Sequence, residues 1–178
     1  MSATDPLPTE FLLFRAGANE TSKGTFVLTP ESAAACMAAY QREGVELIVD
    51  LEHDSLSTEA RNMRSDAGDA RAWFKLELRA DGSLWAVDVR WTPDGERRLR
   101  EKTQRYISPA FEHDEKGVVM QIANAAMCSM PATYNAPALV AASRRSTGAP
   151  SVACQALIYS LIELAKKSRH ISKKVSSR

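Results

Sequence analysis

The sequence predicts a mostly β domain with peripheral helices, an α+β fold, followed by a linker and a C-terminal segment. Short apolar runs separated by turn residues recur up to about residue 130 and indicate strands. Between them, two stretches begin with helix-capping residues. The run RRSTGAPS at residues 144–151 then breaks the pattern. We therefore expect a domain at residues 1–142 and a linker at residues 143–151.

The composition fits a folded domain and excludes several classes of protein. The chain has 178 residues, of which 44% are hydrophobic and 25% charged, enough to build a core. The formal net charge of +1 gives no overall attraction to nucleic acid or to an anionic membrane. No apolar run is long enough to cross a bilayer, and the polar, proline-rich start does not resemble a signal peptide. We expect a protein that stays in the cytosol of the cell that makes it.

The first third of the chain predicts strands around one helix. Phe11–Phe14 and residues 25–28 are apolar runs typical of strands, and RAGANETSKG between them is rich in turn residues. Thr29 is placed to cap an alanine-rich helix, and Gly44 is placed to end it. The apolar run at residues 45–51 predicts a strand buried on both faces.

The middle of the domain predicts a hairpin, a helix and two further strands. Residues 54–68 have weak periodicity and predict a loop that can hold a helical turn. Two strand-like runs then flank an Asp-Gly dipeptide at residues 81–82, which is typical of β-hairpins. Thr92 begins a short polar helix, and strands follow at residues 106–111 and 118–130.

The C-terminal segment differs from the domain in composition. Residues 152–165 are apolar, with leucines spaced to share one helical face. Residues 166–178 contain six Lys or Arg and no acid. Two roles fit this apolar helix and basic tail equally: packing on the protein's own domain, or docking on a scaffold partner.

One histidine stands out as a candidate for chemistry. His113 and His170 lie in charged stretches, whereas His53 ends the apolar run of the expected buried strand. A rigid strand end can hold an imidazole toward a pocket, and Asp50 and Glu52 are close enough in sequence to orient it. A polar strand end with capping side chains is the simpler interpretation of these residues.

Metal and cofactor sites are not predicted. The acids around His53 offer ligands, but strand alternation would place them on the opposite face from the imidazole. The three cysteines, Cys36, Cys128 and Cys154, are far apart and lack a CxxC spacing, which favours buried free thiols over a disulfide or a zinc site.

Ser108, in QRYISPAFE, lies within an expected strand. A serine there is commonly a hydrogen-bonded core residue, and it becomes a nucleophile only if a histidine from another strand reaches it. Spacing alone leaves open whether His53 meets Ser108. His113 follows five residues later, which in a regular strand puts it on the opposite face.

Three blocks of the chain carry motifs in a fixed order. The first, GVELIVDLEHDS, is an aliphatic strand followed by Asp-x-Glu-His. The second runs from LWAVDVRWTPDG to RYISPAF, and the third is AAMCSMPATYNAPAL. Together they cover most of residues 45–140 and resemble the phage Mu-type I protein family, whose members are prohead proteases of capsid maturation.

The resemblance implies a serine endopeptidase without a cofactor, on a closed or nearly closed antiparallel β-barrel distantly similar to herpesvirus assemblin. His53 becomes the general base and Ser108 the nucleophile. Where related prohead proteases carry an acid, seven residues before the proline of the third block, this chain has Asn124. An asparagine can orient an imidazole, so Asn124 is the candidate third member, with Asp50 and Glu52 as alternatives.

The resemblance also implies a biological setting. The substrates would be scaffold protein, major capsid protein and the protease itself, cut inside the prohead in the host cytoplasm, with self-association as the expected means of activation. No membrane or nucleic-acid partner is expected. The alternative is a catalytically silent capsid-assembly factor that binds scaffold through residues 152–178. A cytosolic β-barrel binding domain unrelated to phages is a third hypothesis.

Overall fold

The computed structural model describes residues 6–140 and confirms a mostly β fold with peripheral helices. The predicted linker, C-terminal helix and basic tail lie outside the described residues. The elements in chain order are β1 (Phe11–Phe14), β2 (Gly17–Thr21), β3 (Gly24–Leu28), α1 (Pro30–Glu43), β4 (Leu47–Leu51), a 3-10 turn (Asp54–Leu56), α2 (Thr58–Met63), β5 (Ala72–Leu78), β6 (Leu84–Trp91), α3 (Pro93–Glu101), β7 (Tyr106–His113) and β8 (Val119–Cys128).

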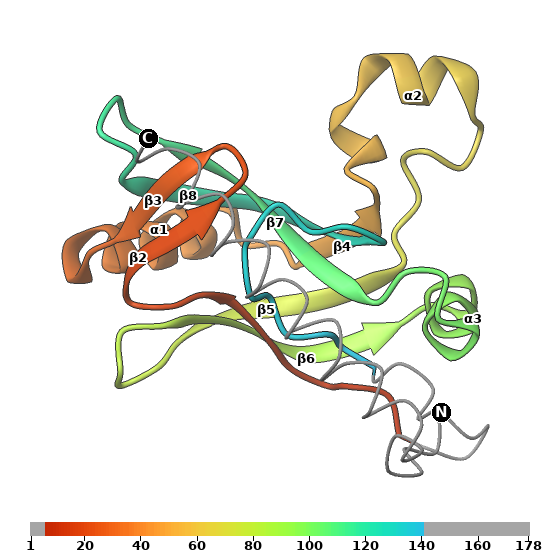
Figure 1. Cartoon of the computed structure of the whole chain (residues 1–178), viewed down its shortest axis with the longest axis horizontal. Helices are drawn as coiled ribbons and strands as arrows, with labels where there is room; N and C mark the ends of the chain where they lie inside the picture. Colours follow the sequence, from red (N-terminus) through yellow and green to blue (C-terminus); the bar gives the residue numbers. More distant parts are fainter. Residues whose placement is uncertain (1–5, 141–178) are drawn as a thin grey trace, which may run out of the picture. The chain divides into compact units, whose positions relative to one another are not determined.

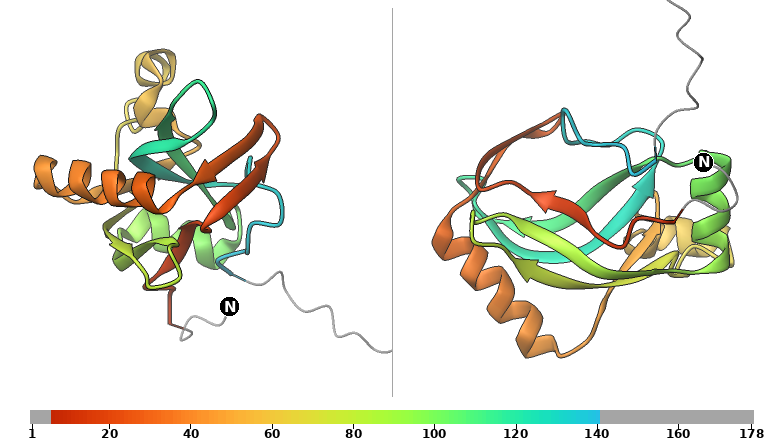
Figure 2. Two further views of the ribbon diagram at one scale, coloured as in Figure 1. Left: turned by 90° about the vertical axis from the view of Figure 1, so that its left-hand side faces the viewer. Right: turned by 90° about the horizontal axis from the view of Figure 1, so that it is seen from below.

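Six strands form one sheet in the order β1-β6-β5-β4-β8-β7 (Figure 1). The sheet curls until its two edge strands, β1 and β7, come into contact, so the barrel is nearly closed (Figure 2). Four of the five pairings are antiparallel, but β4 and β8 are parallel. The expected barrel was antiparallel throughout. The difference is possible because no hairpin joins β4 to β8, so their direction is not set by a short turn.

The segment expected to be turn-rich between the first two strands contains β2, which pairs with β3 as a separate hairpin. Its sequence, GANET, has no apolar alternation, so the local pattern does not reveal a strand. Tertiary contacts support it instead. Ser22 N donates to Ala132 O (2.9 Å), and Tyr134 N donates to Glu20 O (2.9 Å). These bonds fasten the hairpin to the segment that follows β8.

The predicted helix boundaries are confirmed. Thr29 and Ser32 form a reciprocal capping box at the start of α1, and Gly44 ends the helix in a left-handed conformation with φ of 65°. Thr92 caps α3 by accepting a hydrogen bond from Gly95 N (3.3 Å). Helix α1 packs against β8 and β5. Among residues 6–140, no helix is both long and apolar enough to span a membrane.

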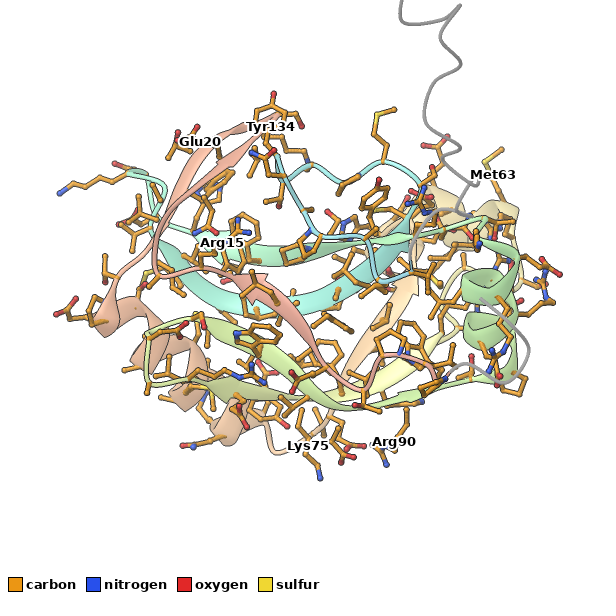
Figure 3. The ribbon with its side chains drawn as sticks, turned by 60° about the horizontal axis from the view of Figure 1, so that its bottom comes forward. Arg15, Glu20, Met63, Lys75, Arg90 and Tyr134 are labelled. Atoms are coloured by element: carbon orange, nitrogen blue, oxygen red, sulfur yellow. The ribbon has the colours of Figure 1, made fainter. Side chains whose placement is uncertain are left out.

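Strand β4 lies at the centre of the sheet, between β5 and β8, as its continuous burial requires. Val49 is fully buried, together with Phe74 of β5 and Ala125 of β8. Charged side chains project away from this core, as Lys75 and Arg90 do in Figure 3. The buried C-terminal end of β4 is therefore a rigid base for the residues that follow it.

Candidate active site

A buried carboxylate closes the C-terminal end of β4. Asp50 is fully buried. Its Oδ1 accepts a hydrogen bond from His53 N (3.2 Å). Its Oδ2 accepts from Ser55 N (3.0 Å), from Ser55 Oγ and from Asn124 Nδ2 (3.2 Å). Because a buried carboxylate is costly unless donors replace the lost water, these four hydrogen bonds fix the turn after the strand.

The turn itself has an unusual backbone. Glu52 and His53 are both left-handed, with φ of 52° and 65°, a conformation that costs residues with side chains on the order of 1 kcal/mol each. Glu52 is held by its N–H, which donates to Met127 O (3.1 Å), and by its carboxylate, which accepts from Ser129 N (3.1 Å). Strand alternation ends at Leu51, so it no longer separates His53 from the neighbouring acids as the sequence suggested.

Ser108 belongs to the same part of the sheet. It lies in β7 opposite Ala126 of β8, and Ala126 lies opposite Asp50 of β4. Residues in one row across neighbouring strands point to the same face. Asn124, two positions before Ala126, shares that face. Strand pairing thus gathers Ser108, Asn124 and Asp50 from three segments that are distant in sequence.

His53 and Ser108 line one cavity of about 320 Å³. Spacing along the chain could not decide whether these two residues lie close together, and the structure places both in the lining of this cavity. We call this cavity the candidate cavity. Its other lining residues are Thr21, Lys23, Phe26, Leu56, Pro109, Ala110, Phe111, His113, Ala132 and Thr133.

Two buried polar atoms here have no hydrogen-bond partner among the described residues: His53 Nδ1 and Asn124 Oδ1. Within the same residues, no hydrogen bond joins Ser108 to His53. A buried polar atom without a partner costs roughly 1–3 kcal/mol, and a catalytic role is one of the explanations for such an atom. Contacts between a nucleophile and its base are often long without substrate. The arrangement therefore suits serine–histidine chemistry, although the hydrogen bond between the two residues is not formed.

The three candidates for orienting His53 have different contacts. Asp50 holds the main chain of His53 and not its ring. The Glu52 carboxylate is directed to Ser129. Asn124 donates through Nδ2 to Asp50 and to Ser55 Oγ (2.9 Å), which leaves its carbonyl oxygen as the acceptor without a partner.

Ser55 is a residue of this network that the sequence did not single out. Its N–H and hydroxyl both donate to Asp50, and its hydroxyl oxygen accepts from Asn124. The available signal was its place in the motif DLEHDS, two residues after His53. A serine in a polar turn is common, however, and nothing local shows that it reaches a strand far along the chain.

Ser108 and His113 both line the candidate cavity, but so do Pro109 and Ala110, which lie between them and alternate in direction, so lining the cavity does not place Ser108 and His113 on one face of the strand. At the two register shifts of the β7–β8 pair the extra residues, Ala123 and Met120, belong to β8, and every residue of β7 from Tyr106 to His113 has a partner. The alternation of β7, on which the expectation that His113 faces away from Ser108 depends, is therefore retained. The imidazole of His113 packs against Phe26, with ring centroids 4.8 Å apart.

The two cysteines in the described part of the chain are free and buried, as predicted. Burial raises the pKa of the Cys36 thiol to about 11 and that of the Cys128 thiol to about 12. Both thiols are therefore protonated at neutral pH and are poor nucleophiles. Within residues 6–140, no group of three or more His, Cys, Asp or Glu side chains is arranged to hold a metal ion.

Comparison with known families gives one match. Residues 11–140 match the family model described as Mu-like prophage I protein, N-terminal domain. The matched region contains every strand of the sheet and all the residues of the candidate cavity. No curated protein and no solved structure gives a significant match to the chain.

Proposed function

Because the chain belongs to the Mu-like prophage I protein family through its N-terminal domain, a phage-related family, we propose that it is a serine endopeptidase of phage head maturation. One observation carries the proposal: His53 and Ser108, far apart in sequence, line the same cavity. The buried Nδ1 of His53 lacks a partner among the described residues and is therefore available to a group that orients the ring.

In the proposed reaction, Ser108 Oγ attacks the scissile carbonyl carbon while the His53 imidazole takes its proton. The C–N bond then breaks, and His53 returns the proton to the leaving amine. Water hydrolyses the resulting acyl-enzyme by the same steps, which restores the free serine.

We assign the third role to Asn124. An N–H at Nδ1 of His53 needs an acceptor to fix the tautomer and the ring orientation. Asn124 Oδ1 is buried and has no partner among the described residues, whereas the Asp50 carboxylate already accepts four hydrogen bonds. Asp50 then acts on the imidazole only indirectly, by holding the main chain of His53 and the amide group of Asn124.

The proposed substrates are scaffold protein, major capsid protein and the protease itself, inside the prohead. The test is co-expression with the neighbouring capsid and scaffold genes, followed by intact-mass spectrometry. Defined fragments should appear with the wild type and with Ser65→Ala, an exposed serine outside the candidate cavity, and should vanish with Ser108→Ala. The same fragments with Ser108→Ala would disprove the role of Ser108.

A catalytically silent assembly factor is the second candidate. It is favoured by the lack of a Ser108–His53 hydrogen bond among the described residues and by an amide, not a carboxylate, at residue 124. A fluorophosphonate probe separates the two functions. Labelling of Ser108 that is lost in His53→Ala supports the protease, and no labelling in assembled proheads supports the silent factor.

A further inference from the structure

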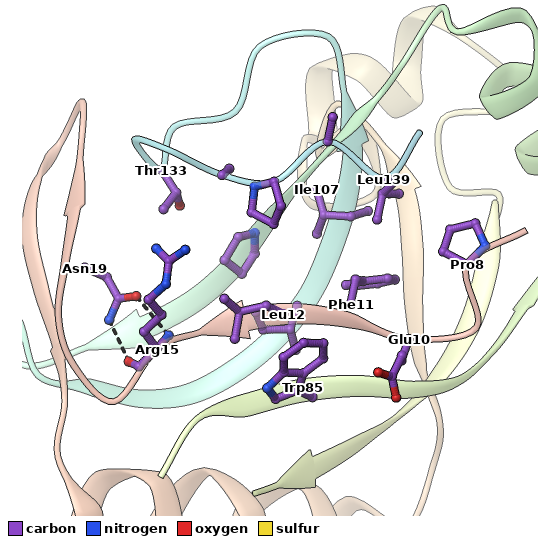
Figure 4. A pocket seen from close by; sticks show the side chains of 15 residues that line it. Pro8, Glu10, Phe11, Leu12, Arg15, Asn19, Trp85, Ile107, Thr133 and Leu139 are labelled. Carbon is purple, nitrogen blue, oxygen red and sulfur yellow. Dashed lines mark hydrogen bonds between the residues drawn. The ribbon is translucent and has the colours of Figure 1, made fainter. Parts of the chain in front are cut away.

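A second cavity has a volume of about 310 Å³ (Figure 4). This cavity and the candidate cavity share Pro109 and Thr133 in their walls. The second cavity lies where the edge strands β1 and β7 approach each other, under the segment at residues 133–139. Because the two cavities adjoin at Pro109 and Thr133, we call them together the edge groove, and Ser108 lines its candidate-cavity part.

The second cavity is mostly apolar at the end opposite Arg15 and Asn19. Phe11, Ile107 and Leu139 line it there. Its one acidic lining residue, Glu10, pairs with Arg79 (2.6 Å). Aliphatic side chains of a ligand would gain free energy by entering this part.

Arg15 is the cation of this cavity. It directly follows β1, it is exposed, and its side chain extends toward Thr133 in Figure 4. Among the described residues, its guanidinium has no carboxylate partner. The buried Asn19 holds its main chain, because Arg15 N donates to Asn19 Oδ1 (3.0 Å) and Asn19 Nδ2 donates to Arg15 O (2.9 Å). These two hydrogen bonds therefore fix the backbone from which the Arg15 side chain extends.

The charges along the edge groove that have no ion-pair partner among the described residues are positive. Lys23, in the wall of the candidate cavity, is also exposed, and no acid lines that cavity among the described residues. With Glu10 already paired, the edge groove presents Arg15 and Lys23 to a ligand. An anionic ligand complements this pattern.

An extended polypeptide suits the shape of the groove. Both β1 and β7 are edge strands, and Pro109 in β7 is typical of an edge because proline cannot donate to a neighbouring strand. Edge strands commonly bind extended segments, whose alternate side chains enter pockets. A segment passing Ser108 would continue into the apolar cavity beside Arg15.

We propose that the edge groove binds an extended substrate segment that carries aliphatic side chains and a carboxylate, and that Arg15 determines specificity by pairing with that carboxylate. This inference rests on the proposed protease function for its substrate, but not for the binding itself. The protein's own C-terminal tail is a poor occupant, because residues 166–178 contain six Lys or Arg and no acid.

The first experiment profiles cleavage of a proteome-derived peptide library by mass spectrometry. Wild type should enrich Asp or Glu at one fixed position near the cut, by about fivefold, the upper range for a solvent-exposed ion pair. Arg15→Glu should reverse the preference to Lys or Arg at that position, and Arg15→Lys should keep it. Arg42→Glu, an exposed cation on α1 outside the groove, is the matched control and should match wild type. Cleavage with no charge preference, equal in wild type and Arg15→Glu, overturns the inference and leaves the protease function standing.

The second experiment measures binding without cleavage, in the full-length Ser108→Ala protein. The probes are fluorescent alanine–leucine decapeptides in which one Glu, or one Lys as control, is moved along the chain. Fluorescence anisotropy should give about fivefold tighter binding for Glu at one position, with the preference reversed when Arg15→Glu is added. Equal binding of both series overturns the inference. Charge-selective binding by a wild type that cuts no peptide supports the groove and removes the protease.

Discussion

Asn124 Nδ2 donates a hydrogen bond of 3.2 Å to Oδ2 of the buried Asp50, across the parallel pair β8 and β4. The contact gives a physical reason for an amide at residue 124. A carboxylate at residue 124 would face the Asp50 carboxylate at hydrogen-bond distance, away from water. An amide donates to it instead.

Replacing Asp50 with Asn should destabilise the domain by about 2–4 kcal/mol. The substitution keeps the size of the side chain but places an amide among four N–H and O–H donors that need an acceptor, from His53, Ser55 and Asn124. Urea unfolding measures the loss. Asp69→Asn, at an exposed position, is the control and should change stability by less than about 0.5 kcal/mol. Equal unfolding free energies for the two variants would contradict the role of the network.

Asn124→Asp should give a domain whose stability falls as the pH rises. Two carboxylates sharing a buried site cannot both ionise without a large cost, so one keeps its proton when the chain is folded. The folded state then binds more protons than the unfolded state, and the unfolding free energy decreases as the pH rises above the ordinary range of aspartate. Urea unfolding at about pH 4.5 and about pH 7.5 tests this. A loss that is the same at both values would argue against direct contact with Asp50.

Ser55→Ala should lower catalytic turnover more than substrate binding. It removes one donor to Asp50 and the acceptor for Asn124, at a cost of about 1–2 kcal/mol in stability. Because these bonds hold the turn that carries His53, we expect kcat to fall about tenfold with little change in KM. Peptide cleavage kinetics measure both constants, with Ser65→Ala as the control. A normal kcat in a destabilised variant would limit Ser55 to a structural role.

Gly95→Ala should weaken the attachment of α3 to the sheet. A Cβ at this position would lie 2.1 Å from Arg71 O and 3.2 Å from the Trp91 ring. The main-chain oxygen cannot move aside cheaply, so we expect a loss of about 2–3 kcal/mol. Gly68→Ala is the matched control, because no heavy atom lies within 4 Å of a Cβ built there. Thermal unfolding should separate the two variants, and similar melting temperatures would show that α3 shifts without cost.

Acid should weaken the ion pairs around the buried Arg71. Its guanidinium lies 2.9 Å from both Asp66 and Asp94, and its Nε–Asp94 contact is an ion pair without hydrogen-bond geometry. A hydrogen bond from Arg98 holds the pKa of Asp94 below its usual range. A lowered pKa contributes stability above the unfolded value of about 3.9, and this is lost as the pH falls through the folded value. Asp94→Asn should therefore lose less stability than wild type between about pH 5 and about pH 3 in urea unfolding. Equal losses would assign the acid sensitivity to other carboxylates.

Several features were predictable because they depend on residues close together in the chain. The capping of α1 by Thr29 and Gly44 is local chemistry, as is the hairpin turn at residues 81–82. The burial of β4 followed from its continuous apolar run. The polar β2 was missed, because pairing with β3 and with residues 132–134 supports it, not an apolar pattern.

The sequence alone was enough to predict most of the strands, α1 and α3 with their caps, and the two residues, His53 and Ser108, that its motifs single out, but not β2 or α2. The folded structure was needed to show that both line one cavity and that Asp50 holds the turn that carries His53. The reason is physical. Caps and turns are set by neighbours in the chain, whereas strand register and buried hydrogen bonds are set by how distant segments share one core.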